Sequence, residues 1–377
     1  MTTIKPNNPF LIAGYYVPAY FCDREQETEQ IINALYNGRN LTLVAPRRMG
    51  KTGLIKHAFY KLHEQQSDII TLYLDIYSMQ NLNEFVQAFG STVLGSLDSV
   101  PQKAMARISQ FIKSCRPVFT LDELSGMPEV SIDIAPEKEM ATLKEIFNYL
   151  QSSEKRCYIA IDEFQQITEY PEKGVEALLR SYIQSLPNVH FIFAGSKQHV
   201  MQEMFLSAKR PFYQSTQTIV IGCINKESYY NFAFSWFKKQ HLTLSKDTFS
   251  GIYDEFEGHT WYIQALLNRL YGYAENPDQE KVARAIREIV EENEYGYQNL
   301  LAAYTSGAIR LVKAIAKERV VPEINAGAFI SKYRLKAASS VNTALRTLTK
   351  MEMVYRTENG YIVYDRFFAI WLRQQPY

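Results

Sequence analysis

A short run near the N-terminus carries the residue types that bind a phosphate chain. It reads Ala45-Pro46-Arg47-Arg48-Met49-Gly50-Lys51-Thr52 and follows the pattern G-x-x-x-x-G-K-[ST], with Ala45 in place of the first glycine. Phosphate oxygens need converging backbone N–H donors, a helix N-terminus and a mobile cation, and a loop between a strand and a helix supplies all three. We expect this run, with Gly53, to bind ATP, Lys51 to reach the β- and γ-phosphates, and Thr52 to ligate Mg²⁺.

Ala45 places a methyl group where the pattern has no side chain. A strand end with negative φ accepts alanine, so we expect a negative φ at this position. A G-K-T triplet alone also occurs in ordinary strand-to-helix turns with an exposed lysine. The surrounding sequence therefore has to decide between the two interpretations.

Two carboxylates follow a second apolar run, Cys157 to Ile161. In open α/β sheets, ligands bind at the carboxyl ends of the strands, which is where Asp162 and Glu163 would lie. Asp162 is expected to hold Mg²⁺ through water, and Glu163 to act as the general base that orients and polarises the attacking water. Taken alone, an Asp-Glu pair after a strand favours a helix cap. Together with the run around Lys51 it favours a nucleotide site.

A third apolar run, Phe191 to Gly195, ends on Ser196. The Ser196 hydroxyl is suited to a hydrogen bond with the γ-phosphate or the attacking water, the role called sensor one. It is equally suited to capping a helix that starts at Lys197. The residues alone leave both roles open.

The elements that must position these side chains alternate between strands and helices. A helix is predicted from Asp23, which can cap it, to Tyr36. Apolar runs without polar alternation indicate strands of a parallel sheet, and the alternation predicts an α/β domain with right-handed crossovers. The predicted strands are 41–45, 69–76, 157–161, 189–194 and 219–222, and the helices between them include 52–65, 82–97 and 175–185.

The segment between the second and third of these strands spans about eighty residues, more than one crossover helix needs. We therefore predict an insertion at about 78–150, with a small hairpin beside two helices. Its strands are Val118 to Leu121 and Val130 to Ile134, around the turn residues Ser125 to Pro128.

After Cys223 the pattern becomes helical up to about Asn299, with aromatic residues that are expected to pack the helices or, alternatively, to line a groove. The last segment has helical patterns at 306–319, 326–332 and 339–350, then a hairpin that turns through Asn359-Gly360. Three helices and a β-wing predict a winged helix-turn-helix. The predicted domains are thus 1–224, 225–300 and 301–377.

Composition narrows the function classes. The 377 residues are 46% hydrophobic and 21% charged, which indicates folded domains rather than disorder. The net charge of +1 excludes a uniformly basic nucleic-acid coat. From Leu301 onward, twelve Lys and Arg against five Asp and Glu give +7, which leaves −6 for the preceding residues. This segregation is compatible with double-stranded DNA contact through the helix at 339–350, where Arg346 and Lys350 lie, or with a protein-contact module.

The cysteines and the hydropathy pattern bear on location. Cys22, Cys115, Cys157 and Cys223 lie far apart without a C-x-x-C pair, so neither a zinc site nor a disulfide framework is expected. No apolar run approaches the ~20 residues of a membrane span. We expect a cytoplasmic protein without a membrane partner.

In order and spacing, six blocks of the sequence resemble P-loop ATPases of the AAA+ and STAND type, and most closely the archaeal-type ATPase family. The resemblance extends over nearly the whole chain. The blocks are Asp23-Arg24-Glu25, Pro46 to Thr52, Ile159 to Phe164, Ala194-Gly195-Ser196, Arg210-Pro211-Phe212-Tyr213 and Gly258-His259-Thr260-Trp261.

The resemblance implies a sheet in the order 5-1-4-3-2, with the strand before Lys51 next to the strand before Ser196. It implies that the adenine lies between the segment from Phe21 to Arg24 and a helical lid. Gly258 to Trp261 resembles the lid's Gly-x-Pro block, with Thr260 in place of the proline. In related ATPases an arginine from a neighbouring subunit completes the site, and Arg210 is the candidate here.

The function predicted from these observations is binding and Mg²⁺-dependent hydrolysis of ATP, coupled to rearrangement of the lid and winged helix. One alternative is a switch or scaffold that binds ATP and hydrolyses it little. Another is a DNA-binding protein that uses ATP for assembly. An oligomer or another protein partner is compatible with each.

Overall fold

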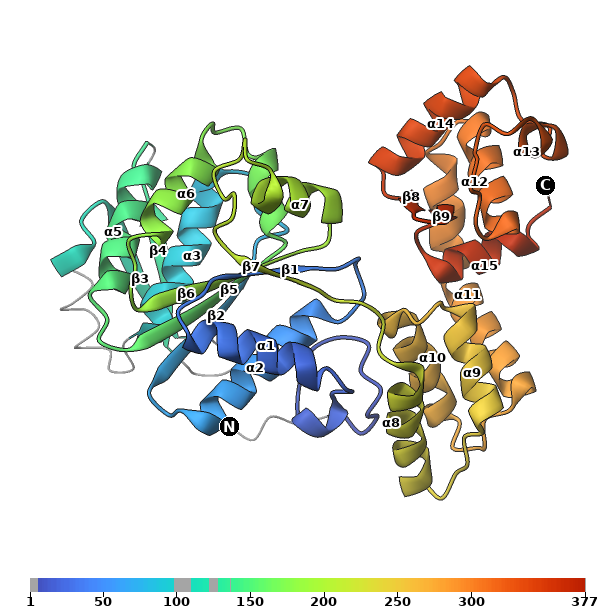
Figure 1. The fold of residues 1–377 in the computed structure, drawn as a ribbon, viewed down its shortest axis with the longest axis horizontal. Helices are drawn as coiled ribbons and strands as arrows, with labels where there is room; N and C mark the ends of the chain where they lie inside the picture. The colour runs from blue at the N-terminus through green and yellow to red at the C-terminus, as the bar shows by residue number, and fades with distance from the viewer. Residues whose placement is uncertain (1–5, 98–109, 122–127, 136, 377) are drawn as a thin grey trace. The chain divides into compact units, whose positions relative to one another are not determined.

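The computed structural model describes residues 6–97, 110–121, 128–135 and 137–376, and it divides into two compact units (Figure 1). The first unit contains Ala13–Asn225, and the second joins Pro6–Ile12 to Lys226–Tyr377. Within the described residues, the chain therefore passes between the units after Ile12 and again after Asn225. The segments predicted as lid and winged helix lie in the same unit.

The first unit is built on a five-stranded parallel sheet. Its strands in spatial order are β2 (Ile69–Asp75), β5 (Arg156–Asp162), β6 (Val189–Gly195), β1 (Leu41–Val44) and β7 (Gln217–Val220). Numbered among themselves along the chain, these strands read 5-1-4-3-2 from the β7 edge, so the predicted order is confirmed. β1 pairs with β6 on one side and β7 on the other.

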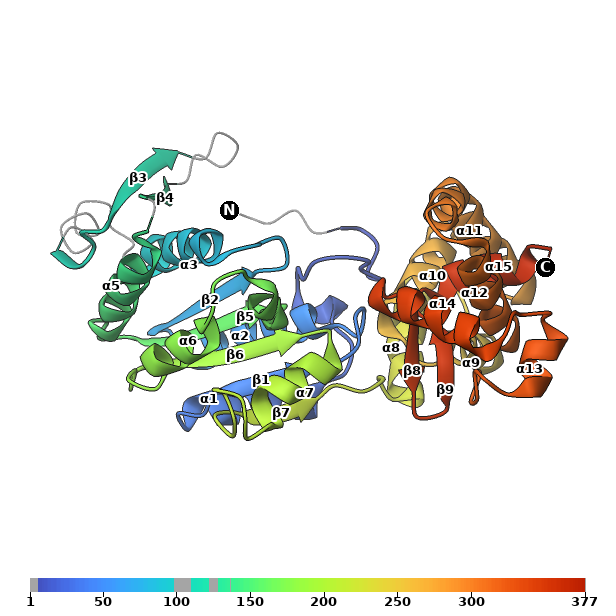
Figure 2. The same cartoon turned by 90° about the horizontal axis from the view of Figure 1, so that it is seen from above.

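Helices cover both faces of this sheet (Figure 2). One face packs against α1 (Glu25–Tyr36) and α2 (Lys51–Gln65). The other face packs against α3 (Leu82–Leu97), α5 (Glu139–Gln151), α6 (Val175–Ile183) and α7 (Gln198–Leu206). Because successive strand residues point to opposite faces, Tyr158 and Ala160 join the first core while Ile159 and Ile161 join the second. Burial on both faces explains the continuous apolar runs in the sequence.

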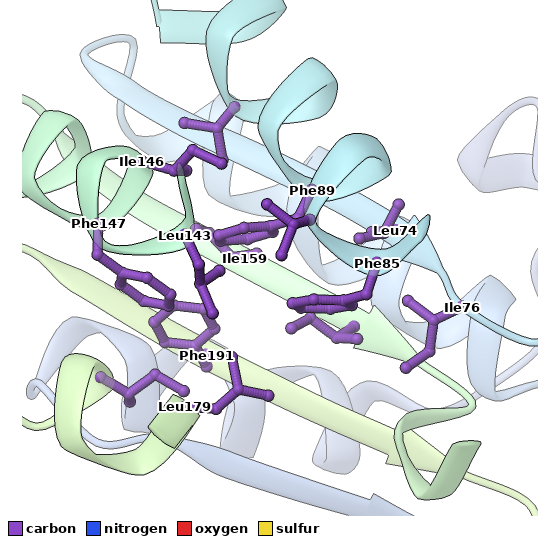
Figure 3. Packing of buried hydrophobic residues seen from close by; sticks show 14 of the residues in the cluster. Leu74, Ile76, Phe85, Phe89, Leu143, Ile146, Phe147, Ile159, Leu179 and Phe191 are labelled. Atoms are coloured by element: carbon purple, nitrogen blue, oxygen red, sulfur yellow. The ribbon is translucent and has the colours of Figure 1, made fainter. Parts of the chain in front are cut away.

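The second core is rich in aromatic rings. Phe85 and Phe89 of α3 stack with their centroids 5.6 Å apart, and Phe147 of α5 packs against both Phe89 and Phe191 of β6 (Figure 3). These contacts join the insertion's helices to the central strands. The insertion is thus part of the first unit's core.

The hairpin predicted in the insertion is confirmed. β3 (Cys115–Leu121) pairs antiparallel with β4 (Pro128–Ile134), while the predicted turn residues Ser125 to Met127 lie outside the described residues. The hairpin lies close to α3 because Gly90 of this helix has no side chain. A Cβ on Gly90 would lie 2.4 Å from Cδ1 of Ile132 and 2.8 Å from Cδ1 of Ile146.

The predicted cap of the first helix is wrong. α1 begins at Glu25, and the residue at its N-cap is Arg24, with no side-chain capping bond. Asp23 and Arg24 are both left-handed, with φ of 57° and 74°. This turn directs Arg24 inward, where it is buried, so a tertiary contact has replaced the local cap.

The second unit begins with four helices, α8 (Lys226–Lys239), α9 (Lys246–Glu255), α10 (Thr260–Gly272) and α11 (Gln279–Ala302). Phe10, from the distant N-terminal segment, is fully buried among Phe232, Phe237 and Tyr271, with ring centroids 5.5 to 6.0 Å away. Two hydrogen bonds fix the segment: the Asn8 amide donates to the Asn268 carbonyl, and the Asn268 amide donates to the Phe10 carbonyl. For these rings, the packing interpretation of the aromatic pattern is confirmed.

The predicted winged helix is present. It comprises α12 (Ser306–Glu318), α13 (Gly327–Lys332), α14 (Ala338–Lys350) and a wing of β8 (Val354–Thr357) and β9 (Gly360–Val363). Gly360 has φ of 140°, and a Cβ there would lie 2.4 Å from the Val321 carbonyl oxygen, so the wing turn requires glycine.

One further helix, α15 (Arg366–Gln374), was not predicted. The sequence did contain a signal for this helix, an aspartate that can cap it followed by an apolar run. In the structure Asp365 is the cap, and it accepts from the Phe368 N–H at 3.0 Å. Phe367 packs on Phe256 and Tyr262 of the helical segment, at 5.2 and 5.4 Å between centroids. α15 therefore joins the winged helix to the four helices before it. Among the described residues, none of the helices combines the length and apolar character that a membrane span requires.

Candidate functional site

The loop between β1 and α2 has the backbone that its sequence predicts. Ala45 is fully buried, and its φ is not positive, as expected for an alanine at a strand end. Gly50, at the N-cap of α2, has φ of 88°, a conformation that glycine adopts without strain. Met49 is buried in the core beneath the loop, while Arg48 is exposed with φ of 68°. The loop is thus anchored by an apolar side chain and opens onto the first turn of a helix.

Lys51 is buried under this loop, with 6% of its surface exposed. Its Nζ donates to the carbonyls of Ala45 and Pro46 at 3.3 and 3.4 Å, which are long and hence weak hydrogen bonds. Burial lowers the pKa of Lys51, and the negative charges of Glu163 and Asp162 oppose that shift. The Lys51 ammonium group therefore has only weak partners here and can exchange them for phosphate oxygens.

The predicted metal ligands lie together. Thr52 Oγ1 donates to Asp162 Oδ2 at 2.7 Å, which joins the start of α2 to the end of β5. A third residue, Tyr73 of β2, donates its hydroxyl to the same Asp162 oxygen at 2.7 Å. Burial and the charge of Asp162 raise the pKa of Tyr73, so the phenol remains a donor. Sequence reasoning missed Tyr73, which reaches Asp162 only because β2 pairs with β5.

A further carboxylate stands at the same edge of the sheet. Asp75 ends β2 and is in register with Asp162 across the strand pair. Its Oδ1 accepts from the Tyr77 N–H at 2.9 Å. Burial raises the pKa of Asp75, and the charges of Asp162 and Glu163 add to the effect. The sequence signal that could have pointed to Asp75 was its position near the end of the predicted strand 69–76.

Glu163 and Ser196 are brought together as well. The Ser196 hydroxyl donates to Glu163 Oε2 at 2.7 Å, and Arg47 Nε approaches Ser196 Oγ at 3.4 Å. The alternative role of Ser196 as a helix cap is not observed, because α7 begins at Gln198 without a side-chain cap. Gln165, which the sequence did not single out, donates its amide to Glu163 Oε2 at 2.5 Å.

The segment before α1 lies against the helix that starts at the phosphate loop. A Cβ on Gly53 would contact Phe21 at 3.5 Å, and Phe21 stacks on His57 of α2 at 4.3 Å. Arg24 does not point into open space. It donates to the Gly222 carbonyl at 2.6 Å and to Glu27 at 2.7 Å, which ties the start of α1 to the chain after β7.

Arg210 lies elsewhere in the first unit. It is paired with Glu176 of α6 and Glu203 of α7, and in the part of the chain that the structure describes it has no bond to the phosphate loop. Action in a neighbouring subunit's site would require it to leave both carboxylates. The role of Arg210 stays a prediction.

The donor set fits the cofactors expected from the sequence. Mg²⁺ prefers hydroxyl, carboxylate and phosphate oxygens, and Thr52 and Asp162 present a hydroxyl and a carboxylate side by side. The N–H groups in the first turn of α2 lack helical partners and attract phosphate, and Lys51 adds a positive charge. The site thus combines groups suited to a triphosphate with groups suited to a divalent metal ion.

A parallel sheet in this order, a phosphate loop after its first strand and acidic residues at the end of its third define a P-loop NTPase. Residues 21–266 match the family described as "ATPase domain predominantly from Archaea", and residues 295–374 match "Probable winged helix domain". The chain therefore belongs to this archaeal-type ATPase family and carries a C-terminal winged helix.

Solved structures of archaeal proteins share the fold. The Walker-type ATPase PABY2304 of Pyrococcus abyssi is 18% identical, with a TM-score of 0.65 over 97% of this chain and 99% of that one. The ORC2 protein of Aeropyrum pernix, in its ADPNP-ADP complexes, is 15% identical, with a TM-score of 0.59 over 97% and 96%. The ORC1 protein of the same organism, in complex with DNA, is 14% identical, with a TM-score of 0.56 over 97% and 96%. A search of curated protein sequences finds no match.

Proposed function

We propose that the protein hydrolyses ATP in a Mg²⁺-dependent reaction at the phosphate loop. The observation that carries the proposal is the 2.7 Å bond between Thr52 and Asp162, which joins two predicted metal ligands from distant parts of the sequence. In an ordinary strand-to-helix turn that contains G-K-T by chance, no carboxylate from another strand is expected at the threonine hydroxyl. The charges of Asp162 and Glu163 near Lys51 add a second, electrostatic link between the two halves of the site.

Each side chain has a distinct role in the proposal. Lys51 binds the β- and γ-phosphates, while Thr52 and Asp162 hold the metal. Mg²⁺, when bound with ATP, offsets charge on the β- and γ-phosphate oxygens. Glu163 takes a proton from the attacking water as the general base. Ser196 orients Glu163 through the hydrogen bond to Oε2.

We further propose that the nucleotide state changes the placement of the second unit. Both chain segments that lead to this unit are tied together inside the first unit, because Arg24 donates to the Gly222 carbonyl. The segment with Arg24 also carries Phe21, which packs on α2 next to the phosphate loop. A shift of α2 on nucleotide binding would thus act on both connections at once.

The catalytic roles are tested by separating binding from turnover. Lys51→Ala should abolish ATP binding or turnover, whereas Glu163→Gln should retain ATP affinity and lose phosphate release. Lys61→Ala is a matched control, because Lys61 lies on the same helix and its ammonium pairs with exposed Glu64. Wild-type phosphate release by Glu163→Gln would refute the assignment of the base.

The purified wild-type protein also distinguishes an ATPase from the alternative, a switch with low turnover. A switch would retain nucleotide through purification and release phosphate very slowly as wild type. An ATPase would show steady phosphate release that depends on Lys51.

A second candidate function, contact with double-stranded DNA, is favoured by the exposed face of α14. Arg346 and Lys350 lie one turn apart on this face and form no ion pair among the described residues. By contrast, Arg319, Arg366 and Arg373 are paired with two glutamates, Glu255 at the end of α9 and Glu257 just after it. The two positive charges on α14 are therefore available to the phosphates of a duplex.

The DNA proposal is tested by salt-dependent binding to a duplex. Neutralising Arg346 and Lys350 should weaken binding and lower the slope against salt by about 1 for each phosphate that these side chains bind. The double variant Lys238→Gln/Lys239→Gln on α8 removes the same charge and should bind as wild type does. Absence of duplex binding by wild type at low salt would remove this candidate.

A further inference from the structure

We infer that Gln165 is a positioning residue for the proposed hydrolysis: its amide fixes one oxygen of Glu163, so that the other oxygen receives the proton from water. The inference rests on the proposed function and adds a specific residue and atom to it. Three features of the described structure support it: the backbone at Glu163, the donors to its carboxylate, and the space around Gln165.

The backbone at Glu163 is held by its buried neighbour in the chain. Glu163 has φ of 54°, a left-handed turn between β5 and the short helix η2 (Phe164–Glu169). Phe164 is fully buried, and its ring centroid lies 4.4 Å from that of Phe193. Because Phe164 anchors the turn in the core, the remaining freedom of Glu163 is in its side chain.

That side chain is held by one oxygen only. Oε2 of Glu163 accepts from Gln165 Nε2 at 2.5 Å and from Ser196 Oγ at 2.7 Å. Arg47 donates to the same serine hydroxyl, which orients it toward Glu163. Within the described residues, Oε1 has no hydrogen bond. Two donors on Oε2 thus fix the carboxylate plane and leave Oε1 as the oxygen available to a water proton.

The site makes space for the amide of Gln165. Gln165 is 2% exposed, and a Cβ on Gly195 would lie 2.3 Å from Gln165 Oε1 and 2.5 Å from Met201 Sδ. The glycine that ends β6 therefore permits the amide to lie beside Glu163.

Burial of this amide argues against a packing role alone. Gln165 Oε1 has no hydrogen-bond partner among the described residues, and an unpaired buried carbonyl is destabilising. A leucine would fill similar space without that cost. What glutamine supplies, and leucine cannot, is the N–H that reaches Glu163.

The test compares Gln165→Leu with Gln166→Leu. Gln166 is the next residue of η2, and its amide donates to the Met79 carbonyl at 3.1 Å rather than to Glu163. Loss of a hydrogen bond to a charged group predicts that Gln165→Leu lowers kcat about ten- to hundredfold with little change in KM for ATP or in thermal midpoint. Gln166→Leu should retain wild-type kcat. A merely structural role would lower the thermal midpoint and leave kcat per folded molecule unchanged.

A second variant keeps glutamine and adds a Cβ at Gly195 that would lie 2.3 Å from Gln165 Oε1 and 2.5 Å from Met201 Sδ. Gly195→Ala should displace the amide and lower kcat in the same way, and it decides the question if Gln165→Leu does not fold. Wild-type kcat in the folded variant would overturn the inference. Phosphate release by Lys51→Ala is subtracted as background from every measurement. If the wild type releases no more phosphate than Lys51→Ala, the proposed function itself fails, whereas Lys51-dependent turnover that Gln165→Leu retains refutes only the role of Gln165.

Discussion

Substituting Phe10 by alanine should destabilise the second unit and spare the first. Phe10 lies in the N-terminal segment, far in sequence from the helices it contacts, and its side chain is fully buried among Phe232, Phe237 and Tyr271. Removing a buried phenylalanine ring costs about 3–5 kcal/mol, from lost burial and from the cavity that remains. With a urea dependence of about 2 kcal/mol per molar, the midpoint should fall by roughly 1.5–2.5 M.

The chain provides a selective probe for this experiment. Its three tryptophans, Trp236, Trp261 and Trp371, all lie in the second unit, so intrinsic fluorescence in urea reports the unfolding of that unit. Without urea, where both units of Phe10→Ala remain folded, ATP affinity should stay at the wild-type value, because the phosphate loop and the expected metal ligands lie in the first unit.

Ile12→Ala is the matched control within the same segment. The Ile12 side chain is 45% exposed, while its backbone carbonyl accepts from the Trp261 indole at 2.9 Å and is retained in the variant. Its effect should be below about 1 kcal/mol. If Phe10→Ala unfolds at the wild-type urea midpoint, the N-terminal segment is not part of the second unit's core and the reasoning is refuted.

Three further predictions concern the first unit. Tyr73→Phe removes a donor to Asp162 and should raise the Mg²⁺ concentration for half-maximal phosphate release about tenfold or more; an unchanged requirement would contradict the role of the phenol. Gly90→Ala introduces a Cβ into the contact with the insertion's hairpin and should cost about 1–3 kcal/mol in thermal unfolding with unchanged ATP affinity, whereas an unchanged Tm would refute the close packing. Burial lowers the pKa of His57, so the folded protein binds fewer protons at this residue than the unfolded chain does. The free energy of unfolding should therefore keep its full value above about pH 6.5 and fall as the pH drops toward the pKa of His57 in the folded protein. Urea midpoints at about pH 7.5 and 5.5 measure this loss, and His57→Gln should reduce it.

The winged helix shows how far local signals reach. The Asn359-Gly360 turn and the helical periodicity of α12 and α14 predict its elements because turn chemistry and periodicity act within a few residues. The attachment of α15 to the preceding helices could not be predicted in the same way. It depends on Phe367 meeting Phe256 and Tyr262 across the fold, and no local pattern encodes that contact.

By itself, the sequence determined the phosphate loop and the strands that flank it, because backbone donors, a helix start and buried apolar runs are properties of contiguous residues. The strand order came from the resemblance and was confirmed by the pairing of β1 with β6 and β7. Only the tertiary structure decided which side chains complete the site. Tyr73 reaches Asp162, and Gln165 reaches Glu163 beside Gly195. A hydrogen bond depends on direction and is lost when the donor–acceptor distance changes by about an ångström, so distances must be set accurately. Such distances are set by the packing of strands and helices that are remote in the chain.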